Sequence, residues 1–140
     1  MTVKNCINRY AIQKQLAKKA GRKTFLAKDL ETQELVVIKL LSFNNGFEWN
    51  DLKLFEREAQ TLRNLQHPNI PRYLDYFEVK SKNFTGFALV QSYIEAPTLE
   101  EYISSGIILT EHEVKQIALR LLKNFRLSTF AFTSSYSPRY

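Results

Sequence analysis

The first part of the chain consists of short runs in which apolar residues alternate with polar ones or are β-branched. In residues 9–17 apolar Tyr10, Ile12 and, less strictly, Leu16 alternate with polar residues, and residues 34–41 (ELVVIKLL) are almost continuously apolar. Alternation is typical of a half-buried strand, and a β-branched run is typical of a central one. Residues 23–30 lie between these runs, so we expect three strands in an antiparallel meander.

A helical pattern follows the three runs. Within residues 51–66 the apolar positions recur at the spacing of one helix face: Leu52, Phe55, Ala59 and Leu62. Asn50 or Asp51 is placed to cap this helix, and the HPN sequence at 67–69 is expected to end it.

Two more strands and two more helices are expected in the remainder. Residues 72–79 and 84–94 have strand character and are joined by a polar turn. After Pro97, residues 98–106 predict a short helix and residues 110–122 a longer one. The predicted fold class is therefore α+β, with a five-stranded antiparallel sheet, one packed helix and two following helices.

Composition narrows the class of protein. The 140 residues are 44% hydrophobic, which suits one globular domain. Cys6 is the only cysteine, so an internal disulfide and a thiolate metal cluster are excluded, and we expect no metal site. No apolar run is long enough to span a membrane, and the N-terminus lacks the apolar block of a signal peptide. We therefore expect a cytoplasmic protein without a membrane partner.

The net charge of +6 raises the question of nucleic-acid binding. Five basic residues cluster in the chain: Lys14, Lys18, Lys19, Arg22 and Lys23. No aromatic residues that could stack on bases are interleaved with them, and acidic residues are spread through the rest of the chain. We expect no nucleic-acid partner.

Lys39 is the first candidate functional residue, because it interrupts the aliphatic run VVIKLL. A buried ammonium group needs a partner or a path to solvent. Glu58, beside the apolar stripe of the predicted helix, is the natural partner. The alternative is a lysine at a strand edge and a glutamate on a solvated helix face, and the two residues alone leave both possibilities open.

The order of these pieces resembles a eukaryotic-type serine/threonine protein kinase from about Tyr10 to Leu122. The matching segments are VVIK, FEREAQTLRNLQHPNI and FALVQSYIEAPTLEEYI. The resemblance implies a kinase small lobe and hinge over residues 10–96, the first two large-lobe helices over 97–122, and an N-terminal extension over 1–9.

The resemblance also implies a site for ATP. Lys39 would hold the α- and β-phosphates, and Glu58 would pair with Lys39. Gln91 would be the gatekeeper residue behind the adenine, and backbone groups of Ser92 and Ile94 would hydrogen-bond the adenine edge. The parent protein would use ATP and magnesium to phosphorylate serine or threonine of a protein substrate.

Three departures from the family pattern bear on activity. The three positions of the Gly-rich loop carry Ala17, Lys19 and Arg22, and Val37 stands where the family usually has alanine. The catalytic-loop aspartate and the magnesium-binding residues of the family have no counterpart. We therefore expect a truncated kinase, inactive alone and at most able to bind nucleotide. The alternative is a pseudokinase-like interaction module with no nucleotide role, whose protein partner the sequence does not identify.

Residues 123–140 do not follow the family pattern. Codons for Thr133 to Tyr140 can be chosen so that the reading frame shifted by one base encodes PPVIHRDI. Codons chosen in the same way from Lys123 onward permit KILDYLHSLL in the shifted frame. In the kinase family the second large-lobe helix continues with a similar sequence, which leads into the His-Arg-Asp catalytic loop. We expect the tail to be an out-of-frame product; the alternative is a true C-terminal tail.

Overall fold

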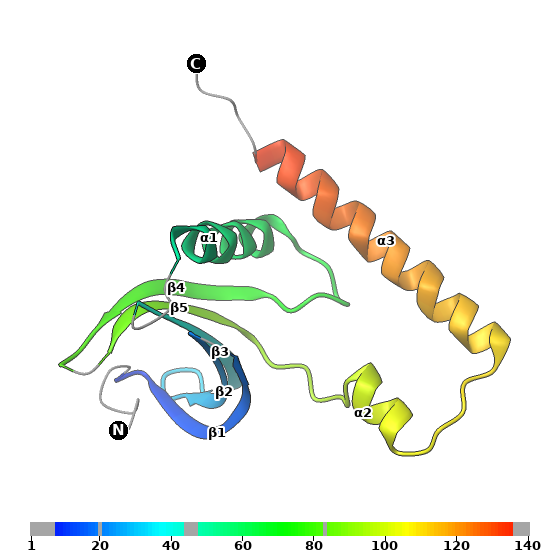
Figure 1. Cartoon of the computed structure of the whole chain (residues 1–140), viewed down its shortest axis with the longest axis horizontal. Coiled ribbons are helices and arrows are strands. Elements are labelled where there is room, and N and C mark those ends of the chain that lie inside the picture. Colours follow the sequence, from blue (N-terminus) through cyan, green and yellow to red (C-terminus); the bar gives the residue numbers. More distant parts are fainter. Residues whose placement is uncertain (1–7, 20, 44–47, 83, 136–140) are drawn as a thin grey trace. The chain divides into compact units, whose positions relative to one another are not determined.

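The computed structural model describes residues 8–19, 21–43, 48–82 and 84–135, with side chains described as far as Asn124 (Figure 1). The chain divides into two units, residues 1–93 and 94–140. The first unit contains β1 (Tyr10–Lys19), β2 (Arg22–Asp29), β3 (Leu35–Ser42), α1 (Trp49–Asn64), β4 (Tyr73–Lys80) and β5 (Thr85–Ser92). The second unit contains α2 (Leu99–Ser104) and α3 (Glu111–Ser135).

The five strands of the first unit form one antiparallel sheet in the order β1-β2-β3-β5-β4. The apolar strand β3 lies in the middle, as its β-branched run predicts. The predicted α+β class and the five-stranded sheet with one helix are confirmed.

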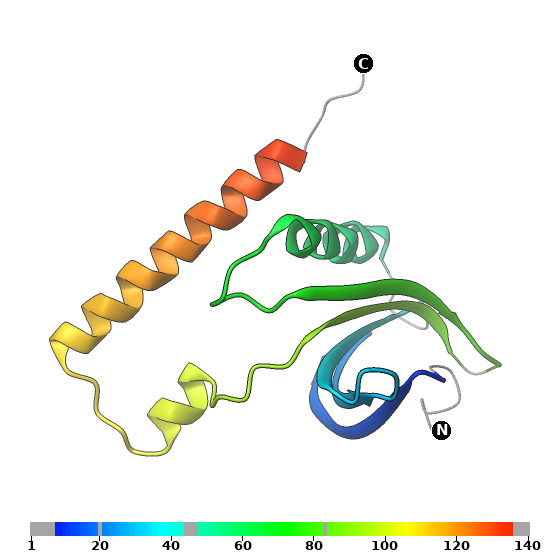
Figure 2. The ribbon, with the colours of Figure 1, turned by 180° about the vertical axis from the view of Figure 1, so that it is seen from behind.

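Helix α1 covers one face of this sheet through the predicted apolar stripe. Phe55 and Ala59 are 4% and 5% exposed, and they pack with Leu41 of β3 and Leu89 of β5. In Figures 1 and 2, which view the ribbon from opposite sides, α1 lies beside β4. Removing these side chains from water holds the helix on the sheet.

The central strand β3 divides its side chains between the two faces of the sheet. Val36, Ile38 and Leu40 belong to one buried cluster, and Leu41 belongs to the cluster beneath α1. Because side chains alternate along a strand, Lys39 shares the face of Leu41. The alternation therefore brings the lysine to the face that α1 covers.

The start of α1 differs from the prediction. The helix begins at Trp49 with Glu48 at the N-cap position and no side-chain cap, so neither Asn50 nor Asp51 caps it. Asp51 lies within the first turn, where a carboxylate is favourable next to the helix N-terminus. Its side chain instead forms an ion pair with Arg22 of β2.

Strand β1 is less regular than its sequence alternation suggests. Its pairing with β2 shifts register between Ile12 and Lys14 and again between Gln15 and Ala17. Each irregularity changes which face the following side chains occupy. As a result Leu16, which the alternation would place on the apolar face, is 41% exposed.

The second unit contains the two predicted helices, and the second of them is longer than expected. Thr98 caps α2 in a capping box with Glu101. Helix α3 continues to Ser135, so the predicted end at Leu122 is wrong. Residues 123–135 contain neither glycine nor proline, so none of them interrupts the helix before Ser135.

Candidate functional site

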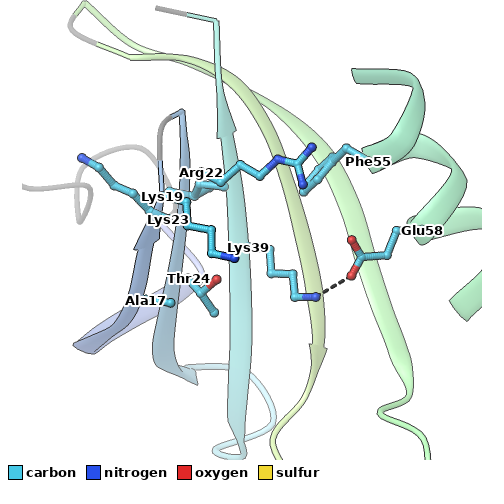
Figure 3. Close-up of a pocket in the computed structure, with 9 residues that line it drawn as sticks. Ala17, Lys19, Arg22, Lys23, Thr24, Lys39, Phe55 and Glu58 are labelled. Carbon is cyan, nitrogen blue, oxygen red and sulfur yellow. Dashed lines mark hydrogen bonds and ion pairs between the residues drawn. The ribbon is translucent and has the colours of Figure 1, made fainter. Parts of the chain in front are cut away.

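A cavity of about 250 Å³ lies where the β1–β2 hairpin and β3 face helix α1 (Figure 3). It is lined by Ala17, Lys19, Arg22, Lys23, Thr24, Lys39, Leu40, Phe55 and Glu58. Five of the eight predicted site residues are thus brought together: Ala17, Lys19, Arg22, Lys39 and Glu58. The other three, Gln91, Ser92 and Ile94, do not line this cavity.

Lys39 occupies the interior of the sheet and not an edge strand. It pairs with Thr24 of β2 on one side and with Leu89 of β5 on the other. Its side chain is 33% exposed, because it emerges into the cavity beside α1. An ammonium group in this position is partly removed from water and favours a nearby anion.

Glu58 supplies that anion. Its Oε1 accepts a hydrogen bond from Lys39 Nζ, and Figure 3 shows the two side chains meeting between strand and helix. Glu58 lies three residues after the buried Phe55, on the side of α1 that faces the sheet. Both charged side chains are about one-third exposed, so the pair contributes modestly to stability. Its main effect is to fix the ammonium group inside the cavity.

A second ion pair joins the hairpin to the helix. Arg22 Nη2 donates a hydrogen bond of 3.2 Å to Asp51 Oδ1, and both side chains are about 40% exposed. Arg22 pairs with Leu41 in the sheet, so it lies on the face that α1 covers. The sequence did not predict this contact, because Asp51 was one of two residues expected to cap the helix.

The glycine of the hairpin serves the turn. Gly21 has a φ of +73°, in the left-handed region that side chains disfavour. Its carbonyl accepts a hydrogen bond of 2.8 Å from the Ser42 amide of β3. The three aligned Gly-rich positions therefore present side chains around the cavity, while Gly21 shapes the turn.

The remaining predicted site residues lie at and beyond the end of β5. Gln91 is half-buried and pairs with Val37 of β3, so it lies on the same side of the sheet as Lys39. The Ser92 amide donates to the Arg72 carbonyl at 2.9 Å. Ile94 belongs to the second unit and is 48% exposed.

These features are those of a protein-kinase small lobe: a five-stranded sheet, one helix, and a strand lysine paired with a helix glutamate. The family of the protein kinase domain matches residues 10–127. The chain belongs to this family. Its fold is the small lobe followed by early large-lobe helices.

Similar proteins include bacterial serine/threonine kinases. Serine/threonine-protein kinase B of Synechocystis sp. is 42% identical over 71 residues, which are 50% of this chain and 12% of that protein. Serine/threonine-protein kinase D of the same organism is 40% identical over 103 residues, 68% of this chain and 20% of that protein. PrkC of Bacillus subtilis is 31% identical over 103 residues, 74% of this chain and 15% of that protein. The chain thus spans a fifth or less of the length of these relatives.

None of the described helices is both long and apolar enough to cross a membrane. Within the same part of the chain, histidine, cysteine, aspartate and glutamate residues do not gather in groups that could hold a metal ion.

Proposed function

We propose that the cavity between the hairpin and α1 binds the phosphates of ATP, and that the whole protein is an ATP-dependent serine/threonine kinase. The observation that carries this proposal is the Lys39–Glu58 ion pair inside the cavity. A lysine fixed by a carboxylate presents a positive charge at a defined point, which suits the α- and β-phosphates of a nucleotide. Membership of the kinase family supports the same role.

The adenine would contact the backbone at the end of β5. The Ser92 amide is occupied by Arg72, and the Ile94 carbonyl accepts a hydrogen bond of 3.0 Å from the Ala96 amide. The contacts we propose are therefore the Ser92 carbonyl and the Ile94 amide. Gln91 would then be the gatekeeper residue.

Binding without transfer is the activity we propose for this chain by itself. The sequence holds no counterpart of the catalytic-loop aspartate or of the magnesium-binding residues. Magnesium bound with ATP would neutralise phosphate charge in the intact kinase. In this chain Lys39 and Glu58 position phosphate and carry no proton to or from a substrate.

Titration of the chain with MgATP by calorimetry tests this proposal. Lys39→Ala is expected to weaken binding about tenfold or more, because a charge-assisted contact to phosphate is lost. Lys53→Ala is the matched control, since Lys53 is exposed on α1 and does not line the cavity. Absence of MgATP binding, or equal affinities for wild type and Lys39→Ala, would favour an interaction module without a nucleotide role.

We also infer that the residues from Lys123 onward are translated from a shifted frame of a kinase gene. The support is that codons for these residues can be chosen so that a shift of one base encodes the kinase-family sequence as far as the His-Arg-Asp loop. Sequencing the DNA from the Leu122 codon to beyond the stop codon tests this inference. An adjacent frame that encodes His-Arg-Asp and then Asp-Phe-Gly is expected, and its absence would refute the shift.

A further inference from the structure

Helix α1 directs two carboxylates toward cations of the sheet; Glu58 lines the cavity itself, and Asp51 contacts Arg22, which lines it. Asp51 and Glu58 are seven residues apart, which is close to two turns, so they lie on one side of the helix. Phe55 lies between them and is buried against the sheet. Each carboxylate holds one cation from the sheet: Asp51 holds Arg22, and Glu58 holds Lys39.

The guanidinium of Arg22 has donors left after this contact. Only Nη2 is bonded to Asp51, and within the described part of the chain Nε and Nη1 have no hydrogen-bond partner. Figure 3 shows the Arg22 side chain extended from β2 toward the helix side of the cavity, where Phe55 lies. A planar guanidinium held at one edge can still present its other N–H groups to an oxyanion.

The charges around the cavity favour an anion. Four cationic side chains line it: Lys19, Arg22, Lys23 and Lys39. The two carboxylates of α1 offset only part of this charge. Cationic side chains at the mouth of a cavity raise the local concentration of anionic ligands. A polyphosphate would supply the missing negative charge.

We propose that Arg22 is a second phosphate-binding residue and that Asp51 positions it, as Glu58 positions Lys39. This proposal rests on the proposed function, because the phosphate would belong to the nucleotide bound there. In place of the backbone cradle that glycines give, the hairpin would hold phosphate through the Arg22 side chain. Recognition would then depend on charge, so inorganic tripolyphosphate would also bind.

The test measures calorimetric affinities for MgATP and for inorganic tripolyphosphate with the full chain. Arg22→Ala is expected to weaken both about tenfold, the usual loss for a charge-assisted hydrogen bond. Arg22→Lys should restore part of the loss, because an ammonium keeps the charge but lacks the fork that serves two oxyanions. Lys53→Ala, which removes an exposed charge of α1 outside the cavity, should change either affinity less than twofold.

The Asp51→Asn variant distinguishes two roles for Arg22: direct contact with phosphate, or only a structural link between the hairpin and α1. If Arg22 binds phosphate, Asp51→Asn should cost about threefold, less than Arg22→Ala, and should cost nothing further in the Arg22→Ala background. Equal losses for the two single variants would mean that Arg22 only ties the hairpin to α1, which would overturn the proposal. Circular dichroism of each variant verifies that the fold is retained.

The outcomes also separate this proposal from the proposed function. If Lys39→Ala weakens MgATP binding and Arg22→Ala does not, the nucleotide site stands and the role of Arg22 is refuted. If tripolyphosphate binds in an Arg22-dependent manner and MgATP does not bind, the phosphate site stands and the nucleotide function is refuted. If wild type binds neither ligand, both are refuted.

Discussion

Asp29 at the end of β2 should make the stability of the first unit sensitive to acid. Its carboxylate accepts two hydrogen bonds from Arg9, Nε at 3.0 Å and Nη2 at 2.8 Å, and a third from the Glu31 amide at 2.9 Å. Asp29 is only 4% exposed. The hydrogen bonds from Arg9 are the main cause that lowers the pKa of Asp29 from 3.8 to about 2.

The magnitude follows from this difference in pKa. The full shift corresponds to roughly 2.5 kcal/mol, and solvent around Arg9, whose side chain is 40% exposed, reduces this to about 1 kcal/mol. Because the folded-state pKa is depressed, the stabilisation is fully present above pH 3.8. It is lost as the pH falls from 3.8 toward 2, since the unfolded chain binds the proton first.

Urea unfolding of wild type and Asp29→Asn between pH 7 and pH 2 measures this contribution. The difference in the free energy of unfolding should be about 1 kcal/mol at pH 7 and should shrink below pH 3.8. Glu34→Gln, at an exposed residue of the adjoining turn, is the control and should follow the wild-type curve. A difference between wild type and Asp29→Asn that stays constant across this range would refute the account.

Three further predictions concern packing. Gly86→Ala should lower the free energy of unfolding in urea by about 3 kcal/mol, because an added Cβ would collide with the Leu41 carbonyl oxygen and lie 2.9 Å from the carbonyl carbon. A loss below about 1 kcal/mol would contradict this. Tyr76→Phe should leave stability unchanged or raise it by about 1 kcal/mol, since the buried Tyr76 hydroxyl has no hydrogen-bond partner in the described part of the chain. A clear drop in the melting temperature of this variant would contradict the prediction and indicate a hydrogen-bond partner. The apolar face of α3, where Leu121 and Leu122 are 58% and 61% exposed, should cause self-association at tens of micromolar; a clean monomer in sedimentation would contradict this.

The elements could be predicted because each depends on local pattern. The β-branched run around Lys39 predicts the central strand, and the spacing of Phe55 and Ala59 predicts the helix face that packs on it. Alternation then places Lys39 on the side of α1, within reach of Glu58. The strand and the helix are local, but their pairing is not: the two residues alone left the Lys39–Glu58 contact open, and the order of elements that resembles a kinase favoured it.

The contacts that the sequence did not predict depend on irregular or distant geometry. Arg22 and Asp51 are 29 residues apart and meet only because the hairpin and the start of α1 lie on the same face of the sheet. The register shifts within β1 have no glycine to signal them, and they expose Leu16. The length of α3 was missed because the family pattern, and not a helix-stopping residue, suggested its end at Leu122.

Adenine recognition is a different case. The contacts proposed for Ser92 and Ile94 use backbone groups, so their side chains carry no signal of the role. The resemblance to kinases suggested these positions, and the structure adds which of their backbone groups are occupied by neighbouring residues. Side-chain patterns alone could not have identified them.

Covalent labelling with an acyl-phosphate derivative of ATP tests the central claim most directly, because the reagent acylates a lysine that lies beside the nucleotide phosphates. Digestion and mass spectrometry then identify the labelled lysine among Lys19, Lys23 and Lys39, which all line the cavity. We predict that Lys39 is labelled and that excess MgATP prevents the labelling. Labelling that spares Lys39, or that MgATP does not reduce, would contradict the assignment of this cavity as a nucleotide-phosphate site.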